Sequence, residues 1–130
     1  MEPKRLIIFL SILFFTAGAY AAENAVDSKR FYEAAVKAQP KNANAHYDLG
    51  NVYFLEERYA DALTHYLEAG KLGIAAARMS NYYFNVSVCY AKLGNVDEAV
   101  KSVEACLKID PDRKSAKDLL AIYKSKTVSP

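Results

Sequence analysis

The fold is decided by residues 43–70, ANAHYDLGNVYFLEERYADALTHYLEAG, and by their partial recurrence at residues 80–106, SNYYFNVSVCYAKLGNVDEAVKSVEAC. In the first stretch, Ala62, Leu63, Tyr66 and Ala69 form a small, large, large, small series, and the same order of sizes returns 37 residues later. Spacings of three, four and seven place such a series on one stripe of a helix. Self-similarity at this period is typical of a chain built from repeated units.

A second helical pattern precedes each stripe. In the first unit it is Tyr47-x-Leu49-Gly50-x-x-Tyr53, and residues 84–90 repeat it in the second. Only short polar breaks, at residues 56–58 and 94–95, separate the two helices of a unit. Connections this short make neighbouring helices antiparallel. Each unit is therefore predicted to be a helical hairpin.

Several local features follow from this pattern. Asn95, with Glu98 three residues later, predicts an N-cap supported by a capping box. Gly70 is expected to end its helix, which would leave a long connection to Ser80. Gly50 is expected at the level of Ala62 on the facing helix, where small residues allow close packing.

The joint spacing resembles the tetratricopeptide-repeat family, whose signature is an aromatic, Leu-Gly, Tyr, Ala, aromatic, Ala, Pro series. Residues 43–79 and 80–113 match one repeat each, residues 22–42 an incomplete leading repeat, and residues 114–126 a capping helix before a 127–130 tail. The resemblance implies an all-α fold. It would be a short right-handed α-solenoid of antiparallel helical hairpins, with about six helices in residues 22–130.

The N-terminus has the pattern of a secretory signal peptide. Lys4 and Arg5 precede an apolar run, and Ala19 and Ala21 bracket one larger residue. We expect residues 1–21 to be removed and the protein to be exported, to the periplasm if the organism is bacterial. Two alternatives are an uncleaved membrane anchor, since the apolar run is near the shortest length that spans a bilayer, and secretion. After cleavage no stable membrane span is expected.

Composition excludes several classes of function. Seventeen Lys and Arg against 15 Asp and Glu give a net charge of +2, which argues against nucleic acid as a partner. The chain has only two His and two Cys, and it contains none of the common phosphate-binding, hydrolase or metalloprotease motifs. We therefore expect no catalytic residues, no enzymatic activity and no cofactor.

The His and Cys residues are expected to be structural. His46 and His65 fall at one level of the first hairpin, but a metal site needs at least three converging ligands, so no metal is predicted. Cys106 is expected level with Ser80, about nine residues along the helix from Cys89. That offset is roughly 13 Å, too far for a disulfide. Both thiols are predicted to be free and mostly buried.

The resemblance also implies a concave groove lined by the first helix of each repeat. Carboxamides bind a peptide backbone and aromatic rings supply contact area, so we predict a non-catalytic adaptor of the cell envelope that binds a protein or peptide segment. The predicted groove residues are Asn44, Tyr47, Asn51, Phe54, Asn81, Phe84, Asn85, Val88 and Lys92. Two alternatives stay open. The aromatic residues could contact only neighbouring helices, and the protein could instead be a self-associating assembly module, for example a homodimer.

Some members of the family hold a peptide's C-terminal carboxylate with Lys, Arg and Asn residues from successive repeats. Asn51 and Asn85 match the two amide positions of that site. The positions for the cations carry Tyr47, Ser115 and Leu119 instead. The sequence therefore predicts that the charge needed for this mode of binding is missing.

Cleavage of the signal peptide is tested by N-terminal sequencing of the protein recovered from its host. We expect the mature chain to begin at Ala22, because the A-x-A pattern ends at Ala21. A recovered chain that still begins at Met1 would contradict the cleavage and favour the anchor.

Overall fold

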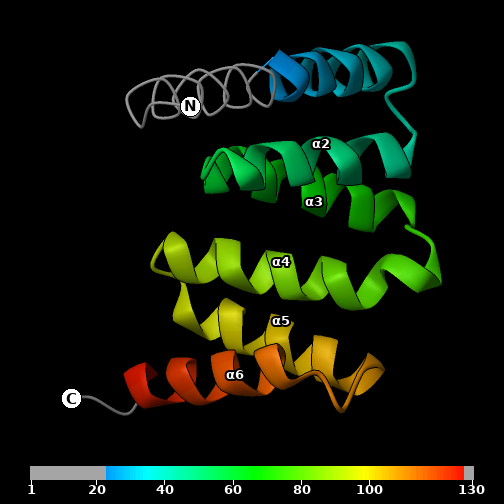
Figure 1. The fold of residues 1–130 in the computed structure, drawn as a ribbon. Coiled ribbons are helices and arrows are strands. Elements are labelled where there is room, and N and C mark those ends of the chain that lie inside the picture. The colour runs from blue at the N-terminus through cyan, green and yellow to red at the C-terminus, as the bar shows by residue number, and fades with distance from the viewer. Residues whose placement is uncertain (1–22, 128–130) are drawn as a thin grey trace, which may run out of the picture.

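The computed structural model describes residues 23–127, which are helical apart from short connections (Figure 1). The described part of a leading helix covers residues 23–38. It is followed by α2 (Ala43–Leu55), α3 (Tyr59–Leu72), the 3-10 turn η1 (Ala76–Arg78), α4 (Met79–Lys92), α5 (Val96–Ile109) and α6 (Lys114–Thr127). The predicted all-α fold is confirmed. The predicted signal peptide, residues 1–21, and residues 128–130 of the tail lie outside the described residues.

The helices pair as hairpins that stack on one another. α2 packs most extensively on α3, and α4 on α5, while α3 contacts α4 and α6 covers α5. Figure 1 shows the leading helix at one end of this stack and α6 at the other. Each hairpin therefore buries its apolar face against a neighbour, as helical repeats do.

The leading helix is held against α2 by polar contacts. Lys29 Nζ lies 3.0 Å from Glu56 Oε2, and the Tyr53 hydroxyl donates to Glu33 Oε1 at 3.0 Å. Phe31 on the leading helix is 67% exposed. This helix consequently contributes less apolar burial than the helices inside the stack.

The two hairpins turn in the same way. Glu57 and Gly94, which are 37 residues apart, have left-handed φ values of 58° and 83°. Gly adopts this conformation without steric cost, whereas a residue with a Cβ loses about 1–2 kcal/mol. The first turn therefore holds backbone strain that the second avoids.

One local prediction is confirmed only in part, and another is wrong. Asn95 occupies the N-cap of α5, but its side chain makes no cap hydrogen bond, and Glu98 pairs with Lys101 instead of reaching back. Gly70 does not end α3, which continues to Leu72 and is capped by Gly73 at φ 90°. This position suits a glycine because of packing and not because the helix ends there: a Cβ at Gly70 would collide with the Tyr82 hydroxyl. The expected long connection is present, with η1 within it.

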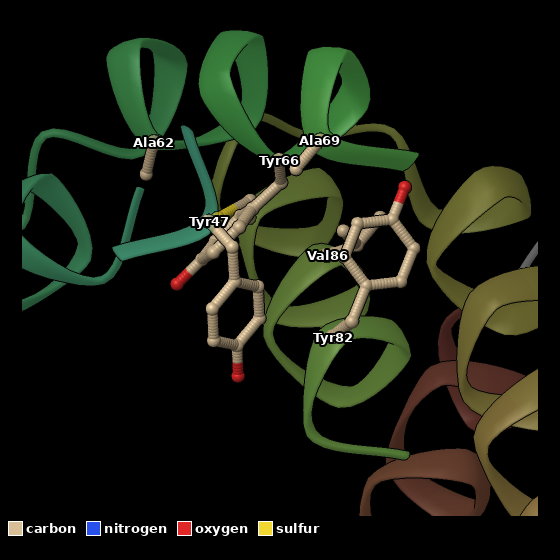
Figure 2. Packing of buried hydrophobic residues seen from close by; sticks show 7 residues of the cluster. Tyr47, Ala62, Tyr66, Ala69, Tyr82 and Val86 are labelled. Atoms are coloured by element: carbon tan, nitrogen blue, oxygen red, sulfur yellow. The ribbon is translucent and has the colours of Figure 1, made fainter. Parts of the chain in front are cut away.

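The core follows the predicted stripes. Ala62, Tyr66 and Ala69 are fully buried on one face of α3, and Figure 2 shows them directed toward Tyr47 and the α4 residues below. A second cluster forms where α5 meets α6. A Cβ on Gly50 would come within 2.7 Å of the Tyr66 ring. The space left by this glycine is therefore filled by Tyr66.

Both cysteines are free and buried. The Ser80 hydroxyl lies 3.5 Å from Cys106 Sγ, which confirms the predicted level of these two residues. Burial raises the pKa of the Cys89 thiol to about 12. Cys89 therefore remains a neutral thiol near neutral pH and packs as a small apolar side chain.

The register of α2 against α3 is tested by Ala62→Leu. The larger side chain should overpack the core of this hairpin and lower the free energy of unfolding by about 1–3 kcal/mol. Ala60→Leu adds the same atoms to an exposed site on the same helix and is the control. Chemical denaturation measures both variants. Equal stability of the two variants would show that Ala62 is not tightly packed in the core between the helices.

Candidate functional site

All nine predicted groove residues lie on the first helices of the two full repeats. Asn44, Tyr47, Asn51 and Phe54 are on α2, and Asn81, Phe84, Asn85, Val88 and Lys92 are on α4. They differ in accessibility. The side chains of Asn44, Asn81 and Lys92 are exposed, those of five others are partly buried, and Tyr47 is buried.

Tyr47 contributes mainly to the core. It is 6% exposed, and its ring centroid lies 5.8 Å from that of Tyr66. Phe54 is half-buried, with its ring edge-on to Tyr59 at 5.7 Å. Most of the surface of Tyr47 therefore contacts neighbouring helices, as the alternative interpretation expects. A partner could reach little of this residue.

A hydrogen-bonded network joins the two repeats at the predicted face. The Tyr66 hydroxyl donates to Asn51 Oδ1 at 2.7 Å. Asn85 Nδ2 donates to Asn51 Oδ1 at 3.3 Å and to the Tyr66 hydroxyl oxygen at 3.2 Å. Burial raises the pKa of Tyr66, so its hydroxyl stays protonated and can donate. Within residues 23–127, Asn51 Nδ2 and Asn85 Oδ1 make no hydrogen bond.

Two arginines reach the same face from the connections between hairpins. The Arg78 guanidinium lies 5.2 Å from the Tyr47 ring centroid and donates to Asp48 Oδ1 at 2.7 Å. The Arg113 guanidinium lies 4.2 Å from the Phe84 ring centroid. Tyr47 and Phe84 are equivalent by the 37-residue repeat. The same contact therefore occurs in both repeats: a guanidinium stacks on the aromatic residue of a first helix.

Arg113 adds a positive charge to this face, outside the three positions at which the sequence predicts that the cations of a carboxylate-holding site are missing. Its Nη1 donates to Asn81 Oδ1 at 2.8 Å and to Ser80 Oγ at 3.2 Å. Within residues 23–127, no carboxylate lies within ion-pair distance of Arg113. Sequence reasoning missed both arginines because they are 35 residues apart, not 37, and precede helices rather than lying on them. Their shared position before α4 and α6 is the signal that could have revealed them.

His46 and His65 are in direct contact, as their common level predicted. Their Nδ1 atoms are 3.1 Å apart, and His46 Nε2 is 2.9 Å from the Pro40 carbonyl oxygen. A carbonyl only accepts, so His46 carries its proton on Nε2, and its Nδ1 accepts from the Nδ1–H of a neutral His65. The pair therefore ties the hairpin to the preceding connection. Over residues 23–127, no three side chains of His, Cys, Asp or Glu are grouped to hold a metal ion.

A small pocket lies between α4 and α6. It has a volume of about 210 Å³, and its lining residues are Val88, Ala91, Lys92, Leu119, Tyr123 and Lys126. Two of the predicted groove residues, Val88 and Lys92, thus line this pocket together with residues of the capping helix.

In the described part of the chain, no helix is both long and apolar enough to cross a membrane.

The histidine pair generates a pH prediction. Burial, and then the proximity of His46, lower the pKa of His65 below its ordinary 6.5, and Asp61 and Glu33 oppose this only in part. As the pH falls through 6.5, the unfolded chain binds a proton before the folded chain does, so stability is lost until the pH reaches the folded pKa. Chemical denaturation between about pH 7.5 and 5.5 should show this decline, and His65→Gln should remove most of it.

Thr64→Gln, at an exposed site next to His65, is the matched control and should keep the decline of the original protein. A decline of equal size in His65→Gln would show that other groups cause the pH dependence.

Comparison with known families agrees with the repeat assignment. Residues 18–77 match one tetratricopeptide-repeat model and residues 80–113 match another. The chain is 32% identical over 93 residues to the Hsp70-Hsp90 organizing protein of Triticum aestivum, covering 72% of this chain and 14% of that protein. It is 38% identical over 72 residues to Hsp70-Hsp90 organizing protein 3 of Arabidopsis thaliana, covering 55% of this chain and 12% of that protein. The chain thus spans about a seventh of the length of the first relative and about an eighth of the second.

Solved structures share the fold. The first TPR of Spaghetti (RPAP3), bound to the HSP90 peptide SRMEEVD, has a TM-score of 0.72 at 18% identity and 87% coverage of both chains. YrrB, described as a TPR protein with an unusual peptide-binding site, has a TM-score of 0.75 at 18% identity, with 88% of this chain and 57% of that chain covered. The hairpin geometry and the two matched models, which together span most of the sequence, lead to one assignment: this chain belongs to the tetratricopeptide-repeat family.

Proposed function

We propose that this protein is a non-catalytic adaptor that binds a segment of a partner protein on the face formed by α2 and α4. One observation carries the proposal. The network of Asn51, Asn85 and Tyr66 orients two carboxamides on this face and leaves Asn51 Nδ2 and Asn85 Oδ1 outside it. One donor and one acceptor are what a peptide group needs to be bound through both of its polar atoms.

The arrangement is rigid, which favours peptide binding. Asn85 is held by two hydrogen bonds, and Arg113 is held by its stacking on Phe84 and its bond to Asn81. Side chains already fixed in place lose little conformational entropy when a ligand binds. The face can therefore bind an extended segment without first ordering itself.

Relatives support the class of partner. One structure of the same fold was solved with an HSP90 peptide, and another is described as having a peptide-binding site. The sequence relatives are named as organizers of Hsp70 and Hsp90. We take from them the binding of a peptide segment and not the identity of the partner. The signal-type N-terminus supports a partner that is also exported, in the cell envelope.

The proposed function is tested by selecting binders to the purified full-length protein from a random peptide library and mapping their site by NMR. We expect shifts centred on the amides of Asn44, Asn81 and Asn85. Asn85→Leu should weaken binding at least tenfold, since it removes the free acceptor and the network bonds. Asn44→Leu, which changes an exposed residue of the same face, should also weaken binding. Because Asn44 is not part of the core, that loss would not come from misfolding.

Asn95→Leu is the matched control, because Asn95 lies in the α4–α5 connection and its side chain caps nothing. Its affinity should stay within twofold of the original. Shifts confined to the outer surfaces of α3 and α5, around Thr64 and Lys101, would contradict the proposal, as would a selection that yields no binder.

A further inference from the structure

Charge is divided between the two layers of helices. α2 and α4 contain one acidic residue between them, Asp48, and it is paired with Arg78. The second helices carry five acidic residues, which are Asp61, Glu68, Asp97, Glu98 and Glu104. α2 and α4 are thus poor in carboxylates of their own, and their one lysine, Lys92, has its Nζ 5.7 Å from the Tyr59 ring centroid rather than beside a carboxylate.

The pocket between α4 and α6 combines this charge with an apolar floor. Val88, Ala91, Leu119 and Tyr123 line it together with Lys92 and Lys126, two lysines in the last turns of their helices. Among the described residues, neither lysine has a carboxylate within 4.0 Å. Nearby Lys124, by contrast, points to α5 and pairs with Glu104 at 3.1 Å.

The helix dipole alone does not explain why an apolar pocket lies between these two lysines. A lysine in a last turn is favoured by the helix dipole, and Lys71 of α3 is such a residue, paired with Glu68. The dipole does not require an apolar depression between two such lysines. At about 210 Å³ the pocket is smaller than sites for drug-sized ligands, which begin near 300 Å³. Its size suits a single side chain.

Arg113 adds a third cation at the other end of the same groove. It stacks on Phe84, eight residues before Lys92 on α4. Eight residues of helix rise about 12 Å, a distance that an extended segment covers in roughly four residues. Acidic groups about four residues apart would therefore reach both ends.

We propose that the pocket between α4 and α6 binds an apolar side chain of an acidic partner segment, whose carboxylates pair with Lys92 and Lys126 at one end and Arg113 at the other. This inference rests on the proposed function and names the chemistry of the partner. Charge complementarity selects the partner, and the pocket fixes its register along the groove.

The probe is a fluorescein-labelled peptide, Asp-Glu-Ser-Leu-Glu-Asp, blocked at both ends and titrated with the full-length protein at low salt. Fluorescence anisotropy should show binding at least tenfold tighter than that of the amide peptide Asn-Gln-Ser-Leu-Gln-Asn. Replacing its Leu by Ser should also weaken binding several-fold, because the pocket would remain unfilled. Binding of the acidic peptide should fall as salt rises.

Variants locate the site. Lys92→Glu with Lys126→Glu should weaken binding at least tenfold, while Lys92→Arg with Lys126→Arg should keep it. The matched control, Lys101→Glu with Lys108→Glu on α5, makes the same change in net charge on the other layer and should stay within twofold. Ala91→Leu should weaken binding without changing charge, because it fills the pocket.

Three results would overturn the inference: no binding of the acidic peptide, equal binding of its amide counterpart, or equal weakening by the α5 control. Peptides selected from the random library that bind the α2 and α4 face, lack acidic residues and tolerate Lys92→Glu with Lys126→Glu would also overturn it, while leaving the proposed function intact. If no selected peptide binds that face, the proposed function fails as well.

Discussion

The ring of Tyr66 is the contact on which the rest of the structure depends. It is fully buried, it occupies the space over Gly50, and its hydroxyl bonds to Asn51 and Asn85. The ring closes the first hairpin, and the hydroxyl joins that hairpin to the next. A buried hydroxyl without partners would cost several kcal/mol, so the amide pair is held in place by the packing of the core.

The second hairpin solves the same packing problem differently. Val103 stands at the position of Tyr66, and Ser87 at that of Gly50. Val103 carries no hydroxyl, Ser87 Oγ donates to the Phe84 carbonyl at 2.6 Å, and the buried Tyr123 of α6 lies beside Ser87. The two junctions between first helices therefore differ in chemistry. The α2–α4 junction has oriented amides, and the α4–α6 junction has a pocket lined by apolar side chains and two lysines.

This difference divides recognition along the proposed binding face. Amides bind the backbone of a segment irrespective of its sequence, whereas the pocket and its cations distinguish one side chain from another. Under the proposed function the arginines serve both structure and binding, since each stacks on a first-helix ring. Stability and affinity are therefore coupled on this face, and controls that separate them are necessary.

The sequence by itself determined the hairpins, their 37-residue repeat, the stripes of Ala62 and Ala99, and the levels of Cys106 and His65, because apolar spacing along one helix reports which side is buried. Only the tertiary structure decided that Tyr47 is buried, that Gly70 continues its helix and that Arg78 and Arg113 stack on rings of the first helices. The physical reason is that these outcomes depend on how one helix lies against the next. Spacing within a helix does not contain that relation, nor the reach of a long side chain from a connection outside the repeat pattern.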